Sequence, residues 1–169
     1  MRYIADNTNI PIPELHCDFE DDGAVYLVME YIEGHTMDQL SAEQRDVVQQ
    51  ELDRHTETLH RLKSRIVGGP SGLIVPPYRV TLKSPREEWE LEESKFDEYV
   101  FCHNDLSQQN VIVDTETLQI QAIIDWVYAG FYPEFFEFPF FKRLGPSVAL
   151  NDEVDDTENL LKFLTSHLK

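Results

Sequence analysis

The part of this sequence that most constrains its fold is a polar loop followed by two apolar runs. The loop at residues 103–110 reads HNDLSQQN and leads directly into the run at residues 111–113. A polar turn at residues 114–117 separates this run from a second one that ends at Ile124. Two apolar runs around a short polar turn predict a β-hairpin. Because paired strands lie ~5 Å apart, the residue that opens the first strand should meet the residue that follows the second.

Three oxygen-bearing side chains fall at this junction. Asn110 opens the first strand, Asp125 follows the second, and Asp105 lies in the loop before Asn110. Carboxylate and amide oxygens can hold Mg²⁺ and leave positions free for substrate phosphates, while Asp105 could accept a proton from a hydroxyl. This is the H-x-D-L-x-x-x-N pattern with a later metal-binding Asp that phosphoryl transfer uses. The alternative is a hairpin with ordinary polar ends, in which His103 and Asp105 are turn and capping residues.

Two further segments extend this pattern. Residues 28–34 read VMEYIEG, and residues 124–134 read IDWVYAGFYPE. With these motifs, the sequence from about residue 1 to residue 144 resembles the aminoglycoside phosphotransferase and choline kinase-like family, within the wider protein-kinase-like fold. The resemblance implies an α+β fold, namely the large C-terminal lobe of a kinase-like protein. That lobe would be mainly helical, with a catalytic β-hairpin and a remnant of the small-lobe sheet.

The resemblance also implies roles for individual residues around the hairpin. Asp105 would be the catalytic base, and His103 would support the loop that carries it. Asn110 and Asp125 would be the ligands of Mg²⁺ or Mn²⁺. The sequence departs from the family locally, because Asn104 takes a place that Gly usually holds.

The N-terminal part would contact the nucleotide. The segment at residues 28–34 looks like the family's hinge, whose backbone groups at Glu30 and Ile32 would hold the adenine ring of ATP. Such kinases normally carry a Gly-rich loop and a strand Lys in a small lobe. Residues 1–34 contain no Gly-rich phosphate loop, and Arg2 is their one basic residue. We therefore expect a remnant of the small-lobe sheet and hinge at 1–34 and the helical large lobe at 35–169, acting as one domain, with ATP binding the property most affected.

Composition narrows the classes of partner. The formal net charge is −18, which argues against nucleic acid and anionic membrane surfaces as partners, because no basic patch is present to neutralise phosphates. An acidic surface can attract a cationic small molecule, such as an amino sugar or a choline-like amine, or it can simply maintain solubility. With no apolar segment of transmembrane length and no signal-peptide layout, we expect a cytoplasmic protein. Cys17 and Cys102 show no metal-ligand spacing, and Cys102 should be a buried residue at the end of a strand.

The first half of the chain shows a hairpin and a long helix. Residues 14–20 and 24–32 predict two strands around the turn sequence Asp-Asp-Gly. Ser41 and Gln44 predict a capping box at the start of a helix. Apolar residues at helical spacing predict its buried side: Val47, Val48, Leu52, Leu59 and Leu62. The pattern favours His55 and His60 as side and flank residues of this helix over metal ligands.

The second half alternates loops and helices. Residues 67–86 are rich in Gly and Pro and predict a long loop. Residues 87–99 are strongly acidic and predict a helix that leads into the catalytic loop, with Trp89, Leu91 and Phe96 interspersed. A final helix is predicted from about residue 152 to residue 168. Its core-facing positions would be Val154, Leu160, Leu161, Leu164 and Leu168.

Six phenylalanines fall within residues 131–141. They could line a pocket for an apolar or aromatic substrate, but core packing is the favoured interpretation because buried aromatic rings contribute much apolar area. Glu134 and Glu137 lie among them. Either could contact a substrate amine or act as a second acid or base, and Glu134, after a proline, could simply stabilise a helix N-terminus.

Three functions are consistent with the sequence. The first is phosphoryl transfer to the hydroxyl of a small molecule with a metal and a nucleotide. The second is a repurposed kinase-like scaffold that performs acid–base chemistry without ATP, such as a cyclisation, dehydration or hydrolysis in small-molecule biosynthesis. The third is a non-catalytic, pseudokinase-like module, which could form a homodimer through the apolar face left by the absent small lobe.

Overall fold

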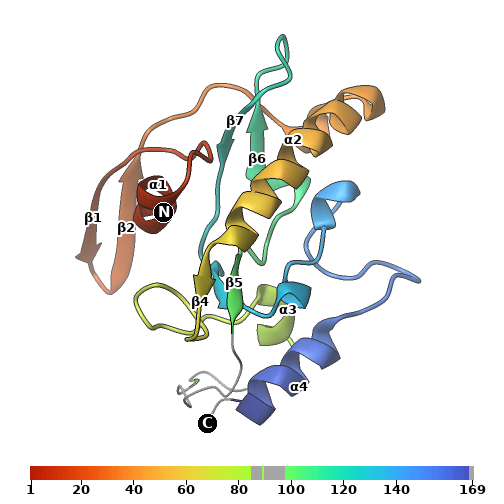
Figure 1. Cartoon of the computed structure of the whole chain (residues 1–169). Helices are drawn as coiled ribbons and strands as arrows, with labels where there is room; N and C mark the ends of the chain where they lie inside the picture. The colour runs from red at the N-terminus through yellow and green to blue at the C-terminus, as the bar shows by residue number, and fades with distance from the viewer. Residues whose placement is uncertain (85–88, 90–97, 168–169) are drawn as a thin grey trace.

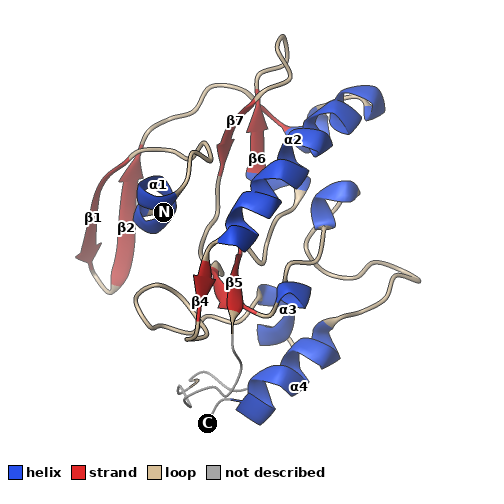
Figure 2. Cartoon of the chain, viewed as in Figure 1, coloured by secondary structure: helices blue, strands red, loops and turns tan. Residues whose placement is uncertain are grey.

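The computed structural model of this 169-residue chain describes residues 1–84, 89 and 98–167. It is a mixed structure of α-helices and small antiparallel sheets (Figure 1, Figure 2). The helices of the described residues are α1 (Arg2–Asn7), α2 (Ala42–Arg61), α3 (Tyr78–Thr81) and α4 (Thr157–His167). The strands are β1 (Leu15–Asp21), β2 (Ala24–Met29), β3 (His35–Thr36), β4 (Lys63–Ser64), β5 (Tyr99–Cys102), β6 (Val111–Val113), β7 (Ile120–Ile123) and β8 (Gly130–Tyr132). Short 3₁₀ turns follow as η1 (Met37–Gln39), η2 (Gln108–Asn110), η3 (Glu134–Phe136) and η4 (Phe140–Lys142).

Strands β1 and β2 form the predicted N-terminal hairpin. Its turn residues Asp22 and Gly23 have φ values of 48° and 76°, as the two-residue turns of twisted hairpins require. Strand β2 ends at Met29, earlier than predicted, and the hinge segment continues without regular structure. The hairpin stands beside α1 (Figure 1), and Arg2 of α1 pairs with Asp18 of β1. Several of its apolar side chains face solvent, including Val25, which is 71% exposed.

The other strands form two three-stranded sheets, ordered β3-β6-β7 and β4-β5-β8. Strands β6 and β7 are the predicted hairpin, and Val111 pairs with Ile123. Strand β3 joins the free edge of β6, where His35 pairs with Val113. This pairing depends on Gly34, because a Cβ atom there would lie 2.7 Å from the carbonyl oxygen of Val113.

Helix α2 begins as predicted, with both halves of the capping box. The Ser41 hydroxyl accepts from the Gln44 N–H at 3.3 Å, and the Gln44 side chain accepts from the Ser41 N–H at 3.0 Å. Val48 and Leu52 are buried on the side that packs against β5. Val47, predicted to share that side, is 51% exposed, because the residue next to Val48 lies about 100° around the helix.

The C-terminal half differs from prediction at several points. The predicted loop at 67–86 contains the short helix α3. The final helix begins at Thr157 and not near residue 152, because the Asp155 carboxylate accepts the Thr157 N–H at 3.0 Å and so caps the chain there. Val154 therefore precedes the helix and is 79% exposed. Most of the helix predicted at 87–99, including Leu91 and Phe96, lies outside the described residues, as does Leu168.

The phenylalanine cluster belongs mainly to the core, as favoured from the sequence. Four of its members are buried: Phe131, Phe136, Phe140 and Phe141. Tyr132 stacks on Phe136 with ring centroids 4.8 Å apart. Within residues 1–84, 89 and 98–167, no helix combines the length and apolar character needed to span a membrane.

Gly130 supplies a test of this packing. A Cβ atom at Gly130 would lie 2.7 Å from a backbone carbon of Gly68, with which β8 forms an isolated bridge through Phe131. We expect Gly130→Ala to lower the free energy of unfolding by about 1–3 kcal/mol, the usual cost of overpacking. Urea unfolding followed by circular dichroism would measure this. An unchanged unfolding midpoint would show that the two backbones do not approach as closely as described.

Candidate functional site

His103 contacts the loop at residues 103–110 from the protein interior. The His103 ring is fully buried, and its Nε2 lies 3.0 Å from the carbonyl oxygen of Ile124. Because a carbonyl can only accept, Nε2 carries the proton, and Nδ1 is free to accept the Asp105 N–H at 3.3 Å. The ring also packs against Trp126 with centroids 4.5 Å apart. His103 thus joins the loop to the chain that follows β7, and burial lowers its pKa to about 4.

Asn104 and Glu137 fix the turn of the loop. Asn104 has a φ of 69°, a left-handed conformation that Asn tolerates better than most residues, which explains why it can replace the family's Gly. Its side-chain amide donates to the Tyr128 carbonyl at 2.8 Å. The Glu137 carboxylate accepts the backbone N–H groups of both His103 and Asn104. Burial raises the pKa of Glu137 to about 7, although these two N–H bonds oppose the shift.

The structure brings together Asp105, Asn110 and Asp125 at the open end of the β6–β7 hairpin. The Asn110 side-chain amide donates to the Asp105 carbonyl at 2.8 Å. The Ile124 N–H donates to the Asn110 carbonyl at 2.9 Å, which sets Asp125 beside this pair. The pKa of Asp105 is raised, first by burial and then by the nearby Asp125 carboxylate among other groups. Asp125 has a φ of 62°, a conformation that costs free energy and is found preferentially at functional sites.

These three residues fit a magnesium ion in their donor chemistry. The Asn110 NH₂ group is engaged with the Asp105 backbone, so its side-chain oxygen is the atom left for a ligand. Asp125 offers an exposed carboxylate. Hard oxygen donors with open positions are the usual environment of Mg²⁺ beside phosphates.

A cavity of about 590 Å³ opens beside Asp125. Its walls come from the N-terminal hairpin, through Leu27 and Met29, and from the segment around Trp126. Glu30 and Ile32, the predicted adenine contacts, follow β2. The Glu30 N–H donates to the Glu14 carbonyl at 2.8 Å, so the Glu30 carbonyl is the backbone group left to a ligand.

Glu134 and Glu137, predicted as substrate contacts, do not join the Asp105 group. Glu137 is buried beneath the loop and bound to its backbone, so it is placed to position the loop. Glu134 is exposed in η3, and its carboxylate lies 3.7 Å from Nδ1 of His60 at the end of α2. The physical reason is that the chain after β8 passes behind the loop, on the side of α2 and β5.

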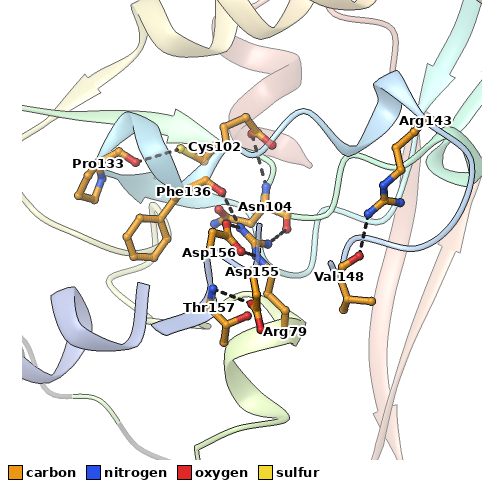
Figure 3. A network of polar contacts seen from close by, with 11 residues as sticks. Arg79, Cys102, Asn104, Pro133, Phe136, Arg143, Val148, Asp155, Asp156 and Thr157 are labelled. Atoms are coloured by element: carbon orange, nitrogen blue, oxygen red, sulfur yellow. Dashed lines mark hydrogen bonds and ion pairs between the residues drawn. The ribbon is translucent and has the colours of Figure 1, made fainter. Parts of the chain in front are cut away.

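The sequence analysis missed Arg79, the residue that holds these parts together (Figure 3). Its buried guanidinium donates to the Asp156 carboxylate at 2.9 and 2.8 Å, to the Asn104 carbonyl at 3.0 Å and to the Phe136 carbonyl at 2.9 Å. The available signal was a single cation inside the otherwise uncharged run at residues 72–82. A cation in such a run needs a buried partner, and the sequence does not identify which acid provides it.

Tyr78 and Tyr128 were also missed. Their ring centroids are 6.5 Å apart. The pKa of Tyr128 is raised, first by partial burial and then by the Asp105 and Asp125 carboxylates. The pair of aromatic rings, Tyr78 and Tyr128, therefore lies at the edge of the site that contains Asp105 and Asp125.

Arg79→Met should be strongly destabilising. It would leave the Asp156 carboxylate, whose side chain is 15% exposed, without its counter-charge, and removing one partner of a buried pair costs roughly 3–5 kcal/mol. Urea unfolding would measure the loss. Lys83→Met is the matched control, because Lys83 and Asp155 form an exposed pair and exposed pairs contribute little. Equal effects of the two substitutions would contradict the role given to Arg79.

His103 should make the fold sensitive to acid. Its pKa of about 4 in the folded chain lies below the ordinary value of 6.5, so between these pH values the unfolded chain binds a proton that the folded chain does not. The contribution of His103 to the free energy of unfolding should therefore fall by up to about 3 kcal/mol as the pH drops from 6.5 to 4. The raised pKa of Glu137, about 7, acts in the opposite direction between pH 7 and 4.5. Unfolding curves at several pH values would measure this slope.

His103→Gln should reduce that slope, measured as the difference from the unsubstituted chain at each pH. His16→Gln, at an exposed position in β1, is the control and should keep the original profile. If both variants retain the slope, another group is responsible for the acid sensitivity.

Known proteins resemble this chain in part of its sequence and in its fold. Residues 78–156 match the model of the phosphotransferase enzyme family, and no curated protein matches the chain. Among solved structures, the fold is similar to that of a type VIII aminoglycoside-3′-phosphotransferase, with a TM-score of 0.55, 20% identity and coverage of 79% of this chain and 57% of the other. It is also similar to a thermostable mutant of another aminoglycoside phosphotransferase, solved with ADP and hygromycin B.

For this second structure the TM-score is 0.56 at 18% identity, with coverage of 80% of this chain and 57% of the other. The chain thus spans 57% of the length of each of these structures. The family match covers the loop, the hairpin and Arg79, and the shared fold extends over most of the chain. Residues 78–156 thus match the phosphotransferase enzyme family in sequence, and most of the chain shares the fold of the aminoglycoside phosphotransferases.

Proposed function

We propose that this chain is a phosphotransferase that transfers a phosphoryl group from a nucleotide to the hydroxyl of a small molecule. The observation that carries the proposal is the convergence of Asp105, Asn110 and Asp125 at the open end of one hairpin. Their positions are set by the register of β6 and β7 and by the bond from Asn110 to the Asp105 carbonyl. These are the residue types that the reaction needs: a proton acceptor and two metal ligands.

Asp105 would accept the proton of the substrate hydroxyl. Its backbone is held by the Nδ1 atom of His103 and by the Asn110 amide, so the carboxylate is presented by a fixed loop. Positioning of this kind supplies much of the catalysis in phosphoryl transfer. His103 and Asn110 would therefore contribute to the reaction partly by positioning Asp105.

Asn110 and Asp125 would hold Mg²⁺ or Mn²⁺. The bound ion would neutralise charge on the phosphates as it develops during transfer. The cavity beside Asp125 would take the nucleotide, and the backbone groups of Glu30 and Ile32, which do not line this cavity, would contact its base. A structural neighbour was solved in a ternary complex with ADP and hygromycin B, which supports a nucleotide as one of the two substrates.

A cationic small molecule is the substrate class that the charges favour. The chain has a net charge of −18, the Asp105 and Asp125 carboxylates lie near Tyr128, and the Tyr78 ring lies 6.5 Å from the Tyr128 ring. Aromatic faces and carboxylates both attract ammonium groups. We propose that such a molecule approaches from this edge of the site.

Three variants test the proposal. Asp105→Asn should lower the rate of phosphoryl transfer by about 10²- to 10⁴-fold, the usual contribution of a general base, while Mn²⁺ still binds. Asp125→Ala should abolish Mn²⁺ binding, because it removes the charged ligand. Glu134→Ala is the control for Mn²⁺ binding and should leave it unchanged, since Glu134 lies beside His60 and not at this site.

Mn²⁺ binding would be followed by paramagnetic broadening of nuclear magnetic resonance signals near Asn110 and Asp125. Nucleotide binding would be followed by calorimetry in the presence of Mg²⁺. An absence of both at millimolar concentrations would overturn the proposal for this chain. Turnover of a substrate without any nucleotide, still dependent on Asp105, would instead support acid–base chemistry on the same scaffold.

A further inference from the structure

A second cluster of ligand-type side chains lies behind the catalytic loop, apart from the proposed magnesium site. A ring nitrogen of His60, the sulfur of Cys102 and a carboxylate oxygen of Glu137 all lie within 4.8 Å of one another. We propose that these three side chains bind a zinc-type divalent cation, and that the ion stabilises the position of the loop at residues 103–110.

Unused polar atoms point to this site. Nε2 of His60 and Oε1 of Glu137 are buried, and neither has a hydrogen-bond partner in the described part of the chain. Burying such atoms without a partner costs free energy, so each needs an explanation. A cation bound by Nε2, Oε1 and the Cys102 sulfur would satisfy both atoms at once.

The three ligands come from three packed elements. His60 lies in the last turn of α2, Cys102 ends β5, and Glu137 follows η3. Helix α2 and η3 both pack against β5, so the cluster does not depend on a free loop. His60 is partly exposed, with 20% of its side chain accessible, and provides a route for the ion from solvent.

Glu134 completes the arrangement from outside. Its carboxylate lies 3.7 Å from Nδ1 of His60, the ring nitrogen opposite the cluster. Histidine ligands of metals almost always donate their other N–H to a carboxylate or a similar acceptor, which orients the ring. Glu134 is placed to accept that N–H after a small side-chain movement.

The ligand types select the class of metal. One thiolate, one imidazole and one carboxylate suit Zn²⁺ and not Mg²⁺ or Ca²⁺, which prefer oxygen ligands alone. On binding, the Cys102 thiol would release its proton to solvent. A thiolate, a carboxylate and a divalent cation then sum to zero charge, which is compatible with a buried site.

The second oxygen of Glu137 connects this site to the loop. It accepts the N–H groups of His103 and Asn104, and Cys102 is the residue before His103. An ion on the other oxygen would therefore fix the Glu137 side chain and, through it, the turn that precedes Asp105. This is a positioning effect, because no ligand of the second site contacts the proposed reacting atoms.

Cobalt titration of the full chain is the direct test, because Co²⁺ replaces Zn²⁺ and a thiolate ligand gives it an intense charge-transfer absorption in the near ultraviolet. We expect one equivalent of Co²⁺ to produce this band, and Zn²⁺ to displace it. Cys102→Ser should abolish the band. Cys17→Ser is the matched control, since Cys17 is the other free cysteine and is exposed, and it should keep the band.

Three further variants separate binding from folding, which far-ultraviolet circular dichroism would monitor. His60→Gln should weaken Co²⁺ binding at least tenfold, whereas His55→Gln, on the same helix, should not. Glu134→Gln should weaken it by about 10- to 100-fold, as expected for a group that orients a ligand.

The proposed magnesium site is distinguished by Asp125→Ala, which should keep the charge-transfer band even where Mn²⁺ binding is lost. Failure of this inference would therefore leave the proposed phosphotransferase function untouched. No charge-transfer band from the folded, unsubstituted chain at millimolar Co²⁺ would overturn the proposal. A band that survives Cys102→Ser and disappears in Cys17→Ser would also overturn it.

Discussion

The buried guanidinium of Arg79 is the contact on which the site depends. It donates to a carboxylate at the start of α4, to a carbonyl in the catalytic loop and to a carbonyl in η3. Segments 77 residues apart in sequence are thus joined by one cation (Figure 3). Only Arg can serve them all, because its planar group presents five donors in fixed directions and stays charged when buried. Without this guanidinium, the loop that carries Asp105 would lose the hydrogen bond to its Asn104 carbonyl.

The charge of the acidic side chains explains why the site needs a positively charged group. Asp105 and Asp125 lie close together, and the Asp125 carboxylate disfavours ionisation of Asp105. The structure offsets this repulsion only partly: side-chain hydrogen bonds from Ser147 and Asn110, and then the charge of Arg79, lower the pKa of Asp105, but burial and Asp125 outweigh them. A divalent cation supplied with the nucleotide would offset the remainder, so the proposed metal has an electrostatic role even before any chemistry. The same reasoning favours an ammonium group on the substrate.

The sequence predicted the parts of the site that are local and periodic. The β6–β7 hairpin follows from apolar runs around a polar turn, and the capping box of α2 follows from Ser41 and Gln44. What the sequence did not predict depends on long-range contacts. Arg79 binds Asp156, which lies 77 residues later in the sequence. Glu137 binds the backbone of the loop and does not face the proposed substrate site. The start of α4 was also predicted too early. Asp155 accepts the Thr157 N–H and Asp156 binds Arg79, so the helix begins after these two residues.

Glu137 shows how the two halves of the site are connected. One of its oxygens is fixed by the backbone of His103 and Asn104, and the other has no hydrogen-bond partner among the described residues. A carboxylate oxygen of Glu137 also lies within 4.8 Å of the ligand atoms of His60 and Cys102. Hydrogen bonds fix only one of the two carboxylate oxygens of Glu137. The position of this side chain therefore depends on what binds the other oxygen. A proton there would leave the loop contacts in place but weaken them, because a neutral carboxyl accepts hydrogen bonds less strongly than a charged one. A cation would keep the carboxylate charged and its loop contacts strong. The position of Asp105 therefore depends on Glu137, which holds the preceding turn, as well as on the residues around Asp105 itself.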